Sequence, residues 1–114
     1  MRHGTCVSRD SKAQALEVKR RYDELNLLKR GRTWTNEEFM LGFVGDVGDL
    51  AKLVMAQEGA RDVPGGIEAL GHELADCFWS VLILADAYEI DLGTEFERTV
   101  THLTSAIDAL TAKA

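Results

Sequence analysis

Four carboxylate side chains stand in two pairs of equal spacing. Asp46 and Asp49 form one pair and Glu73 and Asp76 the other, so each pair shares one face if its segment is helical. Clustered carboxylates need a counter-charge, and oxygen ligands on rigid helices suit Mg²⁺ or Mn²⁺. The pattern predicts a catalytic metal site to which all four side chains contribute. A solvated, purely structural helix face is the alternative for each pair.

The surroundings of the two pairs favour the metal site over the solvated face. The segment 74–88, which contains Asp76, is apolar on nearly all sides, and a lone buried carboxylate must be protonated, paired or metal-bound. Between Arg61 and Arg98 the sequence has no Lys or Arg to serve as a local partner. The first pair lies among Gly42, Gly45 and Gly48, which cost roughly 1 kcal/mol each inside a helix. Such glycines indicate close approach of a helix or a ligand.

Four helices are predicted to position these residues, at about 11–30, 36–57 and 67–88, with a fourth that begins near 91–94. Thr35 and Glu38 form a capping box for the second helix, and either Asp91 or Thr94 caps the fourth. The apolar residues expected to face the core are Val18, Tyr22, Leu25 and Leu28; Phe39, Phe43, Val47, Leu50 and Val54; Leu70, Leu74, Phe78, Val81, Leu82 and Ala85; and Phe96, Val100, Leu103, Ile107 and Leu110.

The predicted fold class is an all-α four-helix bundle, because no stretch alternates as a strand would. We expect residues 1–10 to form a mobile N-terminus and residues 11–114 a single helical domain. The third helix needs more cover than one neighbour provides, which predicts completion of the bundle by oligomerisation.

Charge and hydropathy limit the possible partners and location. Thirteen Lys and Arg against nineteen Asp and Glu give the 114-residue chain a net charge of −6, which disfavours nucleic acid and anionic membranes as partners. The N-terminus lacks the apolar core of a signal peptide, and the longest apolar stretch, 78–85, is too short to cross a membrane. A cytoplasmic protein is expected.

Three segments together resemble the MazG-like all-α nucleotide pyrophosphohydrolases: 41–51, which contains Asp46 and Asp49, 72–76, which contains Glu73 and Asp76, and 90–92. The resemblance covers about residues 35–103. It implies Mg²⁺-dependent hydrolysis of a (deoxy)nucleoside triphosphate to monophosphate and pyrophosphate, as in small house-cleaning enzymes of nucleotide pools. It also implies a homodimer or homotetramer.

The resemblance assigns roles residue by residue. Glu73 and Asp76 match the second family motif, Glu-x-x-Asp, without change, whereas Asp46 and Asp49 replace the two Glu of the first motif. Each replacement shortens the side chain by one methylene, which is compatible with Mn²⁺ preference, weak activity or none. Gly45 stands where many members carry a further Glu that could act as base.

Two residues are candidates for substrate binding. Trp34 could stack on a base, or it could instead anchor the start of the second helix to the core. Lys52 could reach a phosphate, or it could be a solvated residue. Lys29, Arg30 and Arg32 form a basic cluster that could steer triphosphates or complement the C-terminal dipole of the first helix.

Two other functions remain open. One is hydrolysis of phosphoribosyl-ATP by a pyrophosphatase of the same superfamily, although its own signatures are not evident. The other is a catalytically weak or inactive bundle that binds metal, nucleotide or a protein. The two Asp-for-Glu replacements support the second alternative, and the acidity of all four positions supports a working metal site.

Overall fold

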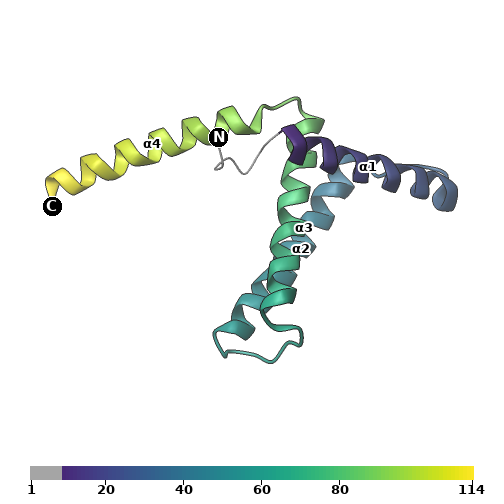
Figure 1. Ribbon diagram of the computed structural model, residues 1–114, viewed down its shortest axis with the longest axis horizontal. Helices are drawn as coiled ribbons and strands as arrows, with labels where there is room; N and C mark the ends of the chain where they lie inside the picture. The colour runs from purple at the N-terminus through teal and green to yellow at the C-terminus, as the bar shows by residue number, and fades with distance from the viewer. Residues whose placement is uncertain (1–8) are drawn as a thin grey trace.

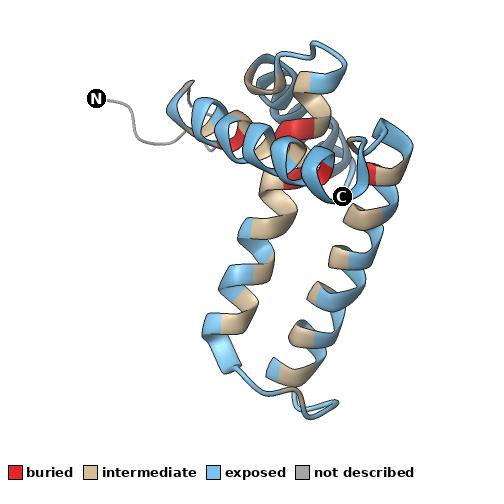
Figure 2. Cartoon of the chain, turned by 90° about the vertical axis from the view of Figure 1, so that its right-hand side faces the viewer, coloured by how far each residue is buried: buried red, intermediate tan, exposed pale blue. Residues whose placement is uncertain are grey.

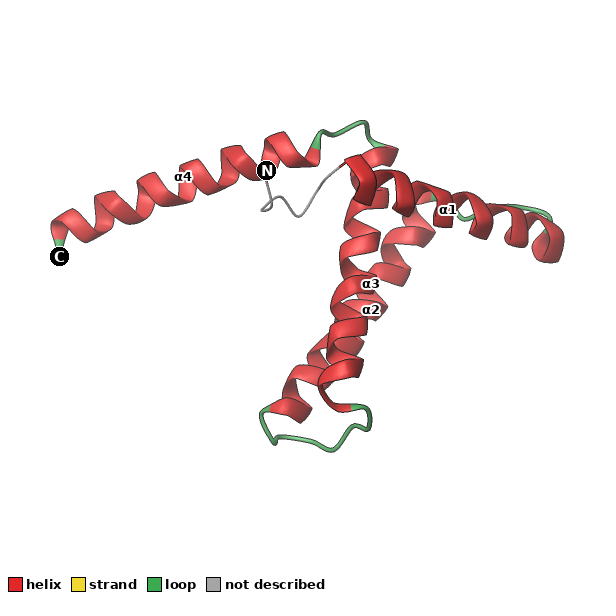
Figure 3. Ribbon diagram, in the orientation of Figure 1, coloured by secondary structure: helices red, strands yellow, loops and turns green. Residues whose placement is uncertain are grey.

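The computed structural model describes residues 9–114, and this part of the chain consists of four helices joined by loops, without a strand (Figures 1 and 3). The helices are α1 (Arg9–Arg30), α2 (Asn36–Gln57), α3 (Gly66–Ala87) and α4 (Leu92–Lys113). The predicted all-α class is confirmed. None of the described helices is long and apolar enough to cross a membrane. Most of the expected mobile N-terminus, residues 1–8, lies outside the described residues.

Side-chain caps fix where α2 and α4 begin. The Thr35 hydroxyl accepts from the Glu38 backbone N–H at 3.1 Å, and the Glu38 carboxylate accepts from the Thr35 backbone N–H at 3.0 Å, as the capping box predicts. At α4, Asp91 is the N-cap and accepts from the Thr94 backbone N–H at 3.1 Å. Thr94 therefore lies inside α4, and the choice between the two caps is resolved in favour of Asp91.

The second and third helices run antiparallel, and α1 crosses them at the end farthest from the 58–65 loop (Figure 1). The buried apolar residues Ala15, Phe39, Leu82 and Ile83 gather at this crossing (Figure 2). The Trp79 indole N–H donates to the Ala15 carbonyl at 3.1 Å and ties α3 to α1. The core is therefore small and sits at one end of the antiparallel pair.

The helices do not close into a four-helix bundle within one chain, because α4 points away from the other three (Figure 1). Its whole expected core stripe is exposed, and the same holds for many residues expected to face inward on the other helices. These exposed residues are Val18, Tyr22, Leu25, Leu28, Val47, Val54, Leu74, Phe96, Val100, Leu103, Ile107 and Leu110. Periodicity identified the apolar face of each helix, but it does not specify which partner covers that face.

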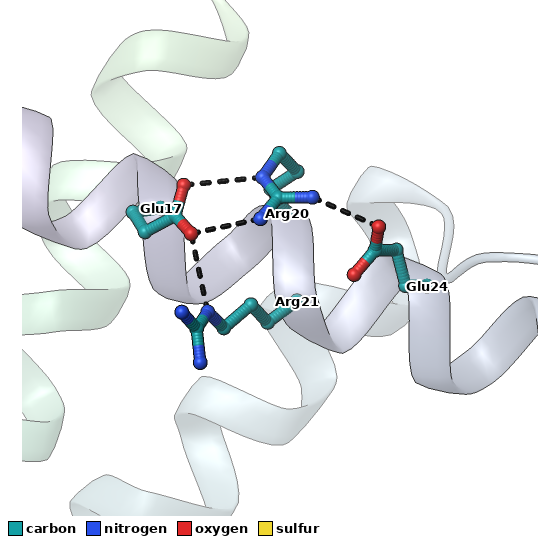
Figure 4. Close-up of polar contacts among 4 residues, drawn as sticks. All are labelled: Glu17, Arg20, Arg21 and Glu24. Atoms are coloured by element: carbon teal, nitrogen blue, oxygen red, sulfur yellow. Dashed lines mark hydrogen bonds and ion pairs between the residues drawn. The ribbon is translucent and has the colours of Figure 1, made fainter.

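The solvent side of α1 carries a network of ion pairs (Figure 4). Arg20 binds both Glu17 and Glu24 at 2.8 Å, and Arg21 binds Glu17 at 3.1 Å. Hydrogen bonds from Arg20 and then Arg21 lower the pKa of Glu17 to about 2. These neighbours one turn apart favour the helical conformation of a helix that makes few contacts with the rest of the chain.

Candidate metal centre and adjoining cavity

Three of the four predicted ligands come together between α2 and α3. Asp46 and Asp49, three residues apart on α2, face Glu73 on α3, and one carboxylate oxygen of each lies within 4.8 Å of the others. The equal spacing and the antiparallel packing produce this cluster, as the sequence predicts. Three negative charges at such distances repel one another unless protons or a cation neutralise them.

Asp46 and Glu73 are the two members of the cluster whose ionised forms are disfavoured by their surroundings. Burial raises the pKa of Asp46, and the charges of Asp76 and Asp49 raise it further. Burial also raises the pKa of Glu73, followed by the charges of Asp46, Asp76 and Asp49. Within the described residues, Glu73 Oε2 is the one buried side-chain oxygen or nitrogen without a hydrogen-bond partner. A divalent cation would satisfy this oxygen and relieve the repulsion, so the donor set fits a hard metal ion.

The fourth predicted ligand, Asp76, lies beside the cluster and not within it. Its Oδ2 atom is 3.3 Å from His72 Nε2, one turn earlier on α3. Asp76 is close enough for its charge to raise the pKa of Asp46 and Glu73. This contact could have been predicted from the sequence, because His72 precedes Asp76 by four residues and so shares its helix face.

A cavity of about 780 Å³ opens next to the cluster, where α1 crosses the α2–α3 pair. Asp46 and Asp76 line it, and Asp46 also belongs to the three-carboxylate cluster. The side chains of Lys19, Lys29 and Arg30 from α1 line it as well. Acidic and basic groups therefore border one space whose volume is typical of small-molecule sites.

Aromatic side chains form one side of the cavity. Tyr22, Trp79, Phe39 and Trp34 follow one another with ring centroids 5.8, 5.4 and 6.5 Å apart. A Cβ atom at Gly42 would lie 3.2 Å from Cζ3 of Trp34, so the glycine leaves room for the indole. The close neighbour of Gly42 is thus a side chain just before its own helix, and not the second helix or the ligand that the sequence predicts. Apart from the chain neighbours and the nearby backbone of α2 itself, no described atom lies within 4 Å of a Cβ built at Gly45 or Gly48.

The two substrate candidates occupy different places. Trp34 lines the cavity, whereas Lys52 is not among its lining residues. Lys52 Nζ instead lies 3.9 Å from Asp49 Oδ1, and the Asp49 side chain is 60 % exposed. Lys52 therefore neutralises part of the outer edge of the cluster.

Sequence reasoning missed Asn26. Among the described residues, the buried polar side chains are Asn26 and Ser80, and both line the cavity. Arg30 donates to the Asn26 side-chain oxygen and so orients the amide. The sequence feature that could have identified this residue is an asparagine next to the apolar positions of the first helix, one residue after Leu25.

Comparison of the chain with known protein families, with characterised proteins and with solved structures found no match. The carboxylate cluster and the cavity beside it are the features of the chain that bear on its function.

Proposed function

We propose that this chain is a metal-dependent nucleoside triphosphate pyrophosphohydrolase of the MazG-like type. The observation that carries the proposal is the position of Asp46, which belongs both to the three-carboxylate cluster and to the wall of the cavity. A ligand held in the cavity can thus bring a phosphate chain to the cluster. Aromatic and basic cavity residues suit the base and the phosphates of a nucleotide.

Asp46, Asp49 and Glu73 would hold Mg²⁺ or Mn²⁺, with Asp76 beside them. A metal ion held by these residues would supply positive charge to the phosphate oxygens and would lower the pKa of the attacking water. The unpaired Glu73 Oε2 supplies one ligand atom that needs no rearrangement of an existing hydrogen bond. Asp76, paired with His72 and outside the three-carboxylate cluster, would accept a proton from that water.

The cavity divides into regions suited to different parts of a nucleotide. Trp34 offers a stacking surface for the base, since every base has a π-face and aromatic stacking tolerates its identity. Lys29 and Arg30 provide positive charge for the triphosphate on the α1 side. We further propose that the enzyme acts in the cytoplasm as a homodimer or homotetramer.

A catalytically weak or inactive metal-binding bundle is the second candidate. Asp49 favours it, because its side chain is largely exposed and already faces Lys52. Its side chain is also one methylene shorter than the Glu of the family motif and so reaches less far toward a shared metal ion. In this alternative the cluster binds a cation and the cavity binds a nucleotide without turnover.

Pyrophosphate release distinguishes the two candidates. The full chain is incubated with ribo- and deoxyribonucleoside triphosphates in Mg²⁺, Mn²⁺ or EDTA, and both pyrophosphate and monophosphate are measured. Metal-dependent release in equal amounts supports the enzyme. Glu73→Gln and Asp49→Asn should abolish it while helical circular dichroism persists, and Glu68→Gln, an exposed α3 residue, is the matched control. If the folded wild-type protein turned over none of the nucleotides, the result would favour the second candidate, a metal-binding bundle without catalysis.

A further inference from the structure

Two polar side chains are buried in the wall of the cavity and have no part in the chemistry proposed above. They are Asn26 on α1 and Ser80 on α3, which are 9 % and 3 % exposed, and they are the buried polar side chains among the described residues. A buried polar group costs free energy unless it has a hydrogen-bond partner. The hydrogen-bonding groups of these two residues therefore indicate what a ligand in the cavity must offer.

Arg30 determines which atom of the Asn26 amide is left for a ligand. A guanidinium group has donors only, so the Asn26 atom to which Arg30 donates is the amide oxygen. The amide nitrogen has no hydrogen-bond partner within residues 9–114. Glu73 Oε2 is the one fully enclosed side-chain atom without a partner among these residues, so the Asn26 nitrogen must keep some accessible surface. Because Asn26 lines the cavity, its two N–H donors are available to a ligand there.

Asn26 lies between an aromatic and a cationic side chain on one face of α1. Tyr22, Asn26 and Arg30 follow one another at steps of four residues, and all three line the cavity. The Tyr22 ring lies 5.8 Å from that of Trp79, at one end of the aromatic row. Aromatic rings suit a base and a guanidinium suits phosphates, so a nucleotide that extends from one to the other passes the Asn26 amide.

We propose that Asn26 selects the base, by donating an N–H to an exocyclic oxygen at its edge. The site then prefers keto bases, such as hypoxanthine and uracil, over the matching amino bases, adenine and cytosine. An amino group in the place of the oxygen brings N–H against N–H and leaves both donors unpaired in a place largely shielded from water. The Ser80 hydroxyl can accept as well as donate, so it is compatible with the ring N–H that stands beside the oxygen in keto bases. This inference rests on the proposed function, because the occupant is a nucleotide.

Pairs of nucleotides that differ in keto against amino character test the proposal. One pair is inosine and adenosine monophosphate, and the other is uridine and cytidine monophosphate. Binding to the full chain is measured by calorimetry in EDTA, so that neither metal nor turnover contributes. In each pair that binds, the keto member should bind about threefold to tenfold more tightly, the range expected for one hydrogen bond.

Asn26→Asp should reverse this preference. The substitution keeps an oxygen for Arg30 but replaces the two N–H donors with an acceptor, which suits an amino base. The added negative charge weakens the binding of every nucleotide, so the ratio of the two affinities within a pair is the quantity compared. Asn36→Asp is the matched control, because Asn36 is exposed and does not line the cavity, and the ratio should keep its wild-type value. Circular dichroism checks that both variants keep their helices.

Equal affinities of the wild type for both members of a pair would overturn the proposal, and so would the absence of binding. An Asn26→Asp variant that weakens all four nucleotides by one factor would also overturn it, because the amide would then contact the sugar or the phosphate. If that variant does not fold, the wild-type ratios decide. Pyrophosphate release with Mg²⁺ is measured separately: release without a keto preference would refute base selection by Asn26 alone, whereas a keto preference without release would refute the enzyme and leave base selection standing.

Discussion

Glu73 is the residue whose surroundings most require a partner. Its Oε2 atom is buried without a hydrogen bond, and burial together with Asp46, Asp76 and Asp49 raises its pKa. Asp46 is in a similar environment at the edge of the cavity. A carboxylate whose folded-state pKa exceeds its unfolded value destabilises the fold as the pH rises through that range. These residues therefore cost stability at neutral pH when no cation is bound.

Asp46→Asn should separate stability from function. Without metal, the variant should melt at a higher temperature than the wild type at neutral pH, because one repelling, partly buried charge is gone. The difference should vanish as the pH falls below the carboxyl pKa values, where the wild-type side chain is protonated. Turnover should fall by at least about 100-fold, since even residues that merely orient metal ligands cost 10–100-fold. A variant less stable than the wild type at neutral pH would contradict this account of the cluster.

Trp34 tests whether the aromatic side of the cavity binds a base. Trp34→Ala should weaken nucleotide binding by roughly tenfold, since stacking contributes about 1–3 kcal/mol per base, and Trp34→Phe should retain most of the affinity. Binding is measured without divalent metal, by calorimetry, so that turnover does not interfere. If Trp34 serves only to anchor the start of α2 against Phe39, the Ala variant will lose stability and keep its affinity.

At the scale of elements, local signals were sufficient to predict the helices but not their arrangement. The Thr35–Glu38 capping box and the Asp91 cap involve residues three apart, so the sequence contains all their partners. The meeting of Asp46 with Glu73 followed from antiparallel packing of two neighbouring helices. The crossing of α1, which creates the cavity and places Asn26 in it, depends on long-range contacts such as that of Trp79 with Ala15. Periodicity contains no information about such contacts.

The ion pairs of α1 yield a prediction about pH. Because the Arg20 and Arg21 hydrogen bonds lower the pKa of Glu17, its stabilising effect is complete above the ordinary pKa of 4.5 and is lost as the pH falls to about 2. Glu17→Gln should therefore melt at a slightly lower temperature than the wild type at neutral pH, and the two curves should converge in acid. The effect should be small and should shrink in high salt, since the groups are exposed. An equal difference at every pH would exclude the ion pairs as its cause.

At the scale of the whole molecule, the three-carboxylate cluster lies between α2 and α3, so a cation held there would link the two helices. The core lies where α1 crosses, and the pair is more exposed toward the 58–65 loop (Figure 2). Between these regions, three carboxylates repel one another across the helix interface. A cation bound there would replace this repulsion with attraction between α2 and α3, and it would thereby stabilise the folded chain.

Mg²⁺ or Mn²⁺ should therefore raise the melting temperature at constant protein concentration. At a free concentration about 100 times the Kd, linkage contributes about 2.7 kcal/mol, a shift of several degrees. The shift in melting temperature should disappear in acid, where Asp46 and Glu73 are protonated. Because the pKa values of both are raised, the shift should be lost at a higher pH than for ordinary carboxylates. Glu73→Gln should abolish it and Glu68→Gln should preserve it. An equal shift in NaCl of matched ionic strength would indicate screening alone, because a site built from both helices responds to the cation and not to ionic strength.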